Sequence, residues 1–275
     1  MKKFLSVAVL LLLTITVLAG CGSKNDEEQV KTNPKPLVVS MDLAHPPFEM
    51  KDEKENPTGV SVDFIKAFGE YVGREVKIQP VSEDQLIPSL QQEKADLVMS
   101  SLFVTEDGKQ LVDFSEPYAQ IELAVLVKKN EGLSSAESLN QKEKKVAVIA
   151  GSAGEIYARK NLSDAEITAL ADENACVSQV LQGKADAFIS DQLMIYSDWK
   201  NYADQTDLLS VGNQEVGKWA IAVQKGDTAL LAQVNEFIET YRINGGFNKL
   251  TSKYLVEEKE DFDRFGLNWI FNMDE

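Results

Sequence analysis

Short apolar segments alternate with amphipathic segments from residue 37 onward. Residues 37–42 (LVVSMD) are short and apolar enough to predict a buried strand. Residues 61–73 (SVDFIKAFGEYVG) repeat apolar side chains every three or four positions, which predicts a helix that begins at a Ser61 cap. The next expected elements are a strand at 75–79, a helix at 84–94 and a strand at 95–100. This alternation predicts an α/β protein with a largely parallel sheet covered by helices.

The alternation starts again in the second half of the chain. Residues 144–161 predict a strand, a glycine turn and a helix, and residues 173–199 predict a helix, a strand and a helix. Between the halves, residues 98–118 predict the end of a strand, a polar turn and a second short strand. Two extended runs, 118–129 and 218–226, connect the halves. Two such units joined by two crossover strands predict two lobes with a hinge between them.

The N-terminus has the organisation of a secretory signal. Lys2 and Lys3 precede an apolar run at 4–18, and small residues lead to Cys21. The sequence LAGC that ends at this cysteine resembles the lipobox of bacterial lipoproteins, which implies that Cys21 is lipidated and becomes the first residue of the mature protein. The predicted signal therefore covers residues 1–20. The alternative is an uncleaved membrane anchor.

The composition limits the classes of partner. Residues 21–36 are polar and charged and contain prolines, so they predict a flexible tether. Loss of the two lysines of the signal would change the formal net charge from −16 to −18, which argues against nucleic acid and against a polybasic membrane contact. The chain has one histidine, and beyond Cys21 its one thiol is Cys176, which is expected to be buried on a helix. We therefore expect no metal and no cofactor.

Several segments together carry a resemblance to a known family. In chain order between residues 37 and 254 they are HPPFEM, GVSVDF, LIPSLQQEKADLVMSS, TEDGKQLVDFSEPY, VAVIAGSAGEIYA, GKADAFISD and WAIAVQKGD. This ordered set resembles the family 3 solute-binding proteins of bacterial amino-acid ABC importers. The resemblance implies a two-lobe periplasmic-binding-protein type II fold with two crossover hinge strands. The expected divisions are lobe 1 at 37–120 and 217–256, lobe 2 at 121–216 and a C-terminal extension at 257–275.

The resemblance also implies where a ligand would bind. An acid at Asp191 would meet the α-ammonium group of the ligand. The helix that begins after Gly151 would hold the α-carboxylate, together with an arginine three residues after the threonine that matches Thr105. In this chain that position is Gly108. The other positions that the resemblance places at the site are Asp42, His45, Glu83, Ser101, Phe103, Gly151, Ser152 and Ala153.

Two further positions depart from the family. Glu83 stands where the family has an aromatic wall, and Phe103 stands where it has a small polar residue. Asp42, Glu83 and Asp191 would then gather in a site where none of the matched positions is arginine or lysine. Because clustered carboxylates need neutralising charge, this composition favours a polar, cationic ligand.

Each of these positions has a structural alternative. Gly108 would be an ordinary turn glycine if Lys109 or backbone N–H groups supply the missing charge. Glu83 would be a solvated acid at a helix N-terminus. His45 would be a structural ring, and Phe103 would belong to the core.

These features lead to a hypothesis about function. The chain is expected to be a monomeric, extracytoplasmic, lipid-anchored substrate-binding protein of an ABC importer and not an enzyme. Its expected partners are a small amino-acid-like ligand, the permease subunits and the membrane that holds the lipid. The alternatives are a protein that binds a standard amino acid through backbone amides, a sensor lobe, and a dehydratase, because some dehydratases that act on cyclohexadienyl acids share the fold.

Overall fold

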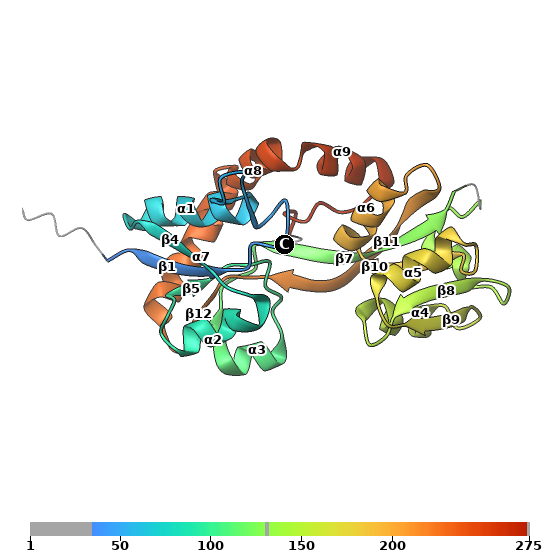
Figure 1. Cartoon of the computed structure of the whole chain (residues 1–275), viewed down its shortest axis with the longest axis horizontal. Helices are drawn as coiled ribbons and strands as arrows, with labels where there is room; N and C mark the ends of the chain where they lie inside the picture. The colour runs from blue at the N-terminus through green and yellow to red at the C-terminus, as the bar shows by residue number, and fades with distance from the viewer. Residues whose placement is uncertain (1–34, 130–131, 274–275) are drawn as a thin grey trace, which may run out of the picture. The chain divides into compact units, whose positions relative to one another are not determined.

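The computed structural model describes residues 35–129 and 132–273 (Figure 1). The predicted signal, Cys21 and nearly all of the predicted tether lie outside the described residues. Two five-stranded sheets and one short hairpin organise the described part of the chain. No helix in this part is both long enough and apolar enough to cross a membrane.

The first sheet has the strand order β4-β1-β5-β12-β6. Its strands are β1 (Leu37–Met41), β4 (Val76–Pro80), β5 (Leu97–Val98), β6 (Val112–Phe114) and β12 (Ala222–Gln224). β1 pairs in parallel with β4 and with β5, whereas β12 runs antiparallel to β5 and β6. The sheet is therefore completed by a strand from far along the chain.

Helices cover both faces of this sheet. Side chains alternate along each strand, so that Leu97 faces one apolar cluster and Val98 faces another. The helices at the Leu97 face are α1 (Val60–Val72), α7 (Thr228–Ile243) and α8 (Gly246–Tyr254). The Val98 face packs against α2 (Leu86–Gln91), which contacts α3 (Glu106–Leu111). We call this sheet with its five helices the first lobe.

The second sheet has the strand order β11-β7-β10-β8-β9. Its strands are β7 (Ala119–Lys128), β8 (Lys145–Ile149), β9 (Glu166–Leu170), β10 (Ala187–Asp191) and β11 (Thr206–Trp219). One face packs on α4 (Ala153–Asn161), and the other packs on α5 (Glu173–Leu181) and α6 (Gln192–Asn201). Cys176 is fully buried on α5, as the sequence predicts. We call this sheet with its three helices the second lobe.

Two long strands carry the chain between the lobes. β7 and β11 pair antiparallel as far as Ala119 opposite Trp219. Beyond that point the Ser115 N–H donates to the Ile221 carbonyl (2.8 Å) and the Tyr118 N–H donates to the Trp219 carbonyl (2.9 Å), which leads both chains into the first sheet. The α/β architecture with two crossover strands confirms the predicted fold class.

The C-terminal segment passes between the lobes once more. α9 (Val256–Phe265) follows α8 of the first lobe and runs toward α6 of the second (Figure 1). There the Tyr196 hydroxyl donates to Asp261 Oδ2 (3.0 Å). The chain then returns to the crossover, where the Gln120 N–H donates to the Ile270 carbonyl (2.8 Å).

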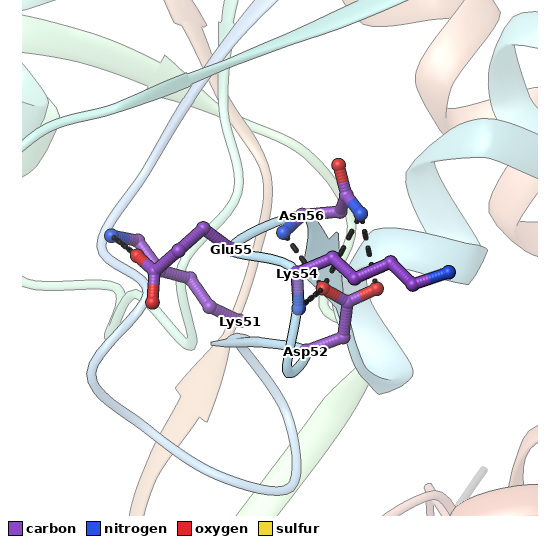
Figure 2. Close-up of polar contacts among 5 residues, drawn as sticks. All are labelled: Lys51, Asp52, Lys54, Glu55 and Asn56. Atoms are coloured by element: carbon purple, nitrogen blue, oxygen red, sulfur yellow. Dashed lines mark hydrogen bonds and ion pairs between the residues drawn. The ribbon is translucent and has the colours of Figure 1, made fainter.

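A small hairpin precedes α1. Figure 2 shows its turn, in which the Asp52 carboxylate accepts hydrogen bonds from the backbone N–H groups of Lys54 (2.8 Å) and Asn56 (2.9 Å). Lys51 and Glu55 form an ion pair at 2.7 Å in the same turn. Hydrogen bonds from Asn56 hold the pKa of Asp52 below its ordinary value. The two strands that this turn joins are β2 (Met50–Lys51) and β3 (Pro57–Thr58).

Two local predictions are wrong, and a third is right about the helix but not about its length. The polar turn expected after Thr105 is the helix α3, whose cap is the Thr105 Oγ1 that accepts the Gly108 N–H (3.0 Å). The cap of α1 is Gly59, two residues before the expected cap, and the Ser61 hydroxyl donates to the Glu49 carboxylate instead. The helix expected at 84–94 is a 3₁₀ turn (Glu83–Gln85) followed by the short α2.

Candidate functional site

The expected site residues lie at the carboxyl ends of strands. Asp42 follows β1 and Ser101 comes shortly after β5, and these strands are parallel neighbours whose ends meet at one edge of the sheet. The Asp42 N–H donates to Ser100 Oγ at 3.0 Å. In the second lobe Asp191 ends β10 and Gly151 follows β8, which are again parallel neighbours. The structure thus brings the candidates together within each lobe.

Asp191 is partly buried and already has a structural role. Its Oδ1 accepts the N–H groups of Leu193 (3.0 Å) and Met194 (2.9 Å), so the carboxylate caps α6. Burial raises the pKa of Asp191, although these backbone hydrogen bonds act in the opposite direction. Because both backbone hydrogen bonds of the cap go to Oδ1, a ligand cation would meet Oδ2.

The N-terminus of α4 has a variant of the capping box, in which the carboxylate meets the residue before the cap. Ser152 Oγ accepts the Glu155 N–H (3.2 Å), and the Glu155 carboxylate reaches back to the Gly151 N–H (2.7 Å). The Gly151 amide, expected to meet the ligand, is therefore engaged by a side chain of the same helix. By helix geometry, the N–H groups of Ala153 and Gly154 have no partner within α4. An anion at this helix would meet these two groups.

Glu83 and His45 are exposed in the first lobe. Glu83 begins the 3₁₀ turn before α2, a position where an acid favours the helix dipole. The backbone of His45 forms an isolated bridge with Glu49, in which the His45 N–H donates to the Glu49 carbonyl (2.9 Å).

Phe103, in the segment after β5, packs against the end of the crossover strand β11. Its backbone forms a bridge with Trp219, and the two ring centroids are 6.1 Å apart. A Cβ atom at Gly217 would lie only 2.8 Å from the Phe103 ring, so this glycine provides the space that the ring occupies. Phe103 keeps 37% of its surface exposed and is not a core residue. This exposure does not fit the alternative in which Phe103 belongs to the core.

Gly108 is buried in the first turns of α3. A Cβ atom there would lie 2.9 Å from Thr105 Oγ1 and 3.0 Å from the Phe114 ring. The neighbouring Lys109 is exposed and pairs with Glu106 at 2.7 Å. In this structure the lysine thus neutralises an acid of its own helix, which weakens the idea that it replaces the missing arginine.

Sequence reasoning missed a buried carboxylate, Glu49. It is fully buried, and its carboxylate accepts hydrogen bonds from the hydroxyls of Ser61 and Ser101. Burial raises the pKa of Glu49 to about 7, although hydrogen bonds from the two serines act to lower it. The Tyr118 hydroxyl is a further buried group nearby, and burial and the Glu49 charge hold its pKa well above the ordinary value.

The Cys176 thiol and the grouping of acidic side chains give little support to a nucleophilic cysteine or to a metal site. Burial, with a smaller contribution from the Asp172 charge, raises the pKa of Cys176 to about 11, so the thiol stays protonated near neutral pH. Within residues 35–129 and 132–273, no three histidine, cysteine or acidic side chains are grouped in a way that could hold a metal ion.

Comparison with known proteins decides the family. The model of the bacterial extracellular solute-binding proteins, family 3, matches residues 37–257, which is most of the chain. The chain belongs to this family. The resemblance noted in the sequence is thereby confirmed, and the two-lobe fold is the one expected of a family 3 binding protein.

Relatives of this family 3 protein include binding proteins and an enzyme. The chain is 32% identical over 263 residues to a probable histidine-binding protein from Neisseria gonorrhoeae. The alignment covers 94% of this chain and 97% of the relative. A solved structure of an ancestral cationic amino acid solute-binding protein has a TM-score of 0.63 and 32% identity, covering 80% of this chain and 95% of that one. An ancestral cyclohexadienyl dehydratase has a TM-score of 0.60 and 27% identity, covering 80% and 92% respectively.

Proposed function

We propose that this family 3 protein captures a cationic, amino-acid-like nitrogen compound between its lobes and delivers it to the permease of an ABC importer. The observation that carries the proposal is Gly108, which stands where the family resemblance expects a carboxylate-binding arginine. The nearest lysine on α3 pairs with Glu106. The charged groups at the strand ends, Asp42 and Asp191, are acids.

Some of the relatives support a cationic ligand, whereas others are named as glutamine-binding and cystine-binding proteins. One is named as a probable histidine-binding protein and another as a cationic amino acid solute-binding protein. A cation would neutralise Asp191, whose burial disfavours an unpaired negative charge. Binding would favour closure of the lobes about β7 and β11 by the difference in affinity between the two states.

A standard amino acid is the second candidate. Its α-carboxylate would bind the N–H groups of Ala153 and Gly154, since a helix N-terminus can hold an anion without an arginine. In this case Asp191 still meets the α-ammonium group. The two candidates differ in whether a free carboxylate improves binding.

Calorimetric titration of matched ligands tests the proposal. L-lysine, L-lysinamide, L-norleucine and Nα-acetyl-L-lysine differ in the carboxylate, the side-chain cation and the α-ammonium group in turn. We expect L-lysinamide to bind at least as tightly as L-lysine, and we expect both to bind more tightly than L-norleucine. Tighter binding of L-lysine than of its amide would favour the standard amino acid, and binding of none of the four would contradict the proposed ligand class.

We further propose that the protein binds without chemistry. The dehydratase neighbour makes the test necessary, because the fold alone does not separate a binding protein from an enzyme. Incubation with a cyclohexadienyl acid, followed by chromatography, should return the acid unchanged. Formation of an aromatic product at a rate above the uncatalysed one would overturn this part of the proposal.

We also propose that the mature protein is a monomer held on the outer face of the cell membrane by a lipid on Cys21. The sequence LAGC and the polar residues after it support this proposal. The wild-type protein should partition into detergent, and Cys21→Ser should abolish this partitioning or block processing. A serine variant that fractionates with membranes at its mature size would contradict the lipid anchor.

A further inference from the structure

Glu49 connects two parts of the first lobe. The Ser61 hydroxyl reaches it from α1, and Ser101 Oγ lies 3.0 Å from each of its two carboxylate oxygens. Ser61 is twelve residues away in the chain, and Ser101 is fifty-two residues away. One fully buried carboxylate thus joins α1 to the segment that follows β5.

The position of Glu49 is itself fixed. The chain leaves Glu49 into the β2–β3 hairpin and returns to it at Gly59, where the Ser61 N–H donates to the Phe48 carbonyl (3.0 Å). A Cβ atom at Gly59 would lie 2.4 Å from that same carbonyl oxygen, so only glycine allows this close approach. The carboxylate therefore projects from a closed hairpin base.

Ser101 has an unusual backbone conformation. Its φ angle is +47°, in the left-handed region that residues other than glycine rarely adopt. Such a conformation persists only where surrounding interactions hold it. Hydrogen bonds to a buried carboxylate are strong interactions of this kind, and Glu49 supplies them.

Ser101 also begins the segment that carries candidate site residues. Next to it, Leu102 accepts the Ala220 N–H (3.1 Å), and the Val104 N–H donates to the Lys218 carbonyl (2.9 Å). Phe103, between these bonds, is thereby held against β11. The path of this segment along the crossover strand starts from the conformation of Ser101.

We infer that Glu49 is a positioning residue for ligand binding, which acts through Ser101 to hold residues 100–104 in the arrangement that meets the ligand. The inference rests on the proposed function, because it assumes that this segment contacts the ligand. Glu49 itself is buried behind the segment and does not touch the ligand. Burial also raises its pKa to about 7, while the hydrogen bonds from Ser61 and Ser101 act to lower it, so the two hydroxyls favour the charged carboxylate.

Two variants break the connection from its two sides, and a third is a matched control. Ser101→Ala removes the hydroxyl from the site segment, and Glu49→Met removes the acceptor. Ser61→Ala removes the other hydroxyl from the same carboxylate but leaves the bond to Ser101. The buried hydroxyl of Tyr118 lies beside the Ser101 hydroxyl and can take its place as a donor, so Ser101→Ala should fold. If Glu49→Met does not fold, Ser101→Ala carries the test, and Glu49→Gln, which keeps one acceptor oxygen, should have a smaller effect.

Two measurements separate positioning from stability. The first is the Kd for L-lysine and L-lysinamide by calorimetry. At a pH above the pKa of Glu49, where its carboxylate is charged, Ser101→Ala should weaken binding about tenfold, the loss that a hydrogen bond to a charged group represents, while Ser61→Ala should change Kd less than twofold. Ser101→Ala should add nothing further in the Glu49→Met background. The second measurement is amide hydrogen exchange of peptides covering residues 99–105 in the ligand-free protein, which should become faster in Ser101→Ala and not in Ser61→Ala.

The outcomes distinguish this inference from the proposed function. Equal effects of Ser101→Ala and Ser61→Ala on Kd and on exchange at 99–105 would show that Glu49 only stabilises the fold, and the inference would be wrong. If neither probe binds the wild-type protein, the proposed ligand class is wrong. In that case faster exchange confined to 99–105 in Ser101→Ala still supports the positioning role, and unchanged exchange overturns it.

Discussion

Asp191 combines a helix cap and a candidate cation site in one side chain. Asparagine caps a helix about as well as aspartate but carries no charge, so Asp191→Asn and Asp191→Ala separate the two roles. Both variants should weaken binding of the cationic ligand by roughly thirtyfold or more, because truncating one member of a buried charge pair typically costs about 2 to 5 kcal/mol. Only Asp191→Ala should also lose about 1 kcal/mol of stability through the missing cap. Calorimetry and urea unfolding measure the two effects.

The raised pKa of Asp191 gives a pH dependence to the same binding. Burial makes this carboxyl protonate at a higher pH than an ordinary aspartate, and the protonated form does not attract a cation. The affinity should therefore fall as the pH is lowered through the raised pKa, and the fall should be smaller in Asp191→Asn. Equal pH profiles for the two proteins would show that another group titrates.

Gly108 allows a test of the missing carboxylate-binding arginine. Gly108→Arg should shift the preference toward ligands with a free carboxylate, raising the ratio of L-lysine to L-lysinamide affinity by about tenfold. Gly108→Ala is the matched control, because it adds the same Cβ atom against Thr105 and Phe114 without the charge. An unchanged ratio in a folded arginine variant would mean that residue 108 does not face the ligand. Pairing of the new arginine with the exposed Glu83 is removed by adding Glu83→Trp.

At the scale of elements, Gly154 sets how closely α4 approaches β10. A Cβ atom at Gly154 would lie 2.3 Å from the Ile189 carbonyl oxygen, a backbone atom that has little freedom to move. The same contact fixes the distance between the start of α4 and Asp191 at the end of β10.

Gly154→Ala should therefore destabilise the protein by about 1 to 3 kcal/mol, although the same change in an unhindered helix usually stabilises. Ligand affinity should fall as well, because α4 must move away from Asp191. Gly108→Ala is again the comparison, since the atoms near its Cβ belong to side chains that can shift, and its loss should be smaller. Urea unfolding and calorimetry measure both quantities, and a neutral Gly154→Ala would contradict the close approach.

The elements that the sequence predicts well are those with a strong apolar period. α1 and the buried strands β1, β8 and β10 repeat apolar residues at helix or strand spacing, and the resemblance orders them into two lobes. α3 escaped prediction because its sequence EDGKQL has no apolar period, and its start depends on a threonine cap. A cap residue with no apolar period after it is not enough to predict a helix.

The candidate site also contains residues that the sequence could predict and residues that it could not. Positions at strand ends follow from the order of elements, so Asp42 and Asp191 could be placed from the sequence. Glu49 could not, because its burial depends on hydroxyls twelve and fifty-two residues away. The engagement of the Gly151 amide by Glu155 was likewise hidden, although the spacing of Ser152 and Glu155 is a recognisable capping box.

At the scale of the molecule, the C-terminal segment joins the lobes in addition to β7 and β11. Phe262 of α9 is fully buried between Tyr196 of the second lobe and Trp269 of the tail, with ring centroids 5.5 Å from each. Phe271 then stacks on Phe247 of the first lobe at 4.8 Å. A cavity of about 240 Å³ lies where these segments meet the loop before β2. One apolar cluster consequently continues through both lobes.

This continuity predicts how the protein unfolds. With the segment in place, the lobes share buried apolar surface, so calorimetry should record one transition. Truncation after Leu255 removes α9 and the tail, and it exposes the faces of Tyr196 and Phe247 that they cover. The lobes should then unfold separately, with the second lobe melting first, because it loses the helix that covers α6.

A point variant keeps this last prediction testable if the truncated chain aggregates. Phe262→Ala leaves the segment in place and removes a fully buried ring, a change that typically costs about 3 to 5 kcal/mol. It should broaden or split the calorimetric transition, with the second lobe again melting first. Phe265→Ala, at a half-buried position beside Trp199, should have a smaller effect. A single transition at an unchanged temperature in both Phe262→Ala and the truncated protein would show that β7 and β11 alone couple the lobes.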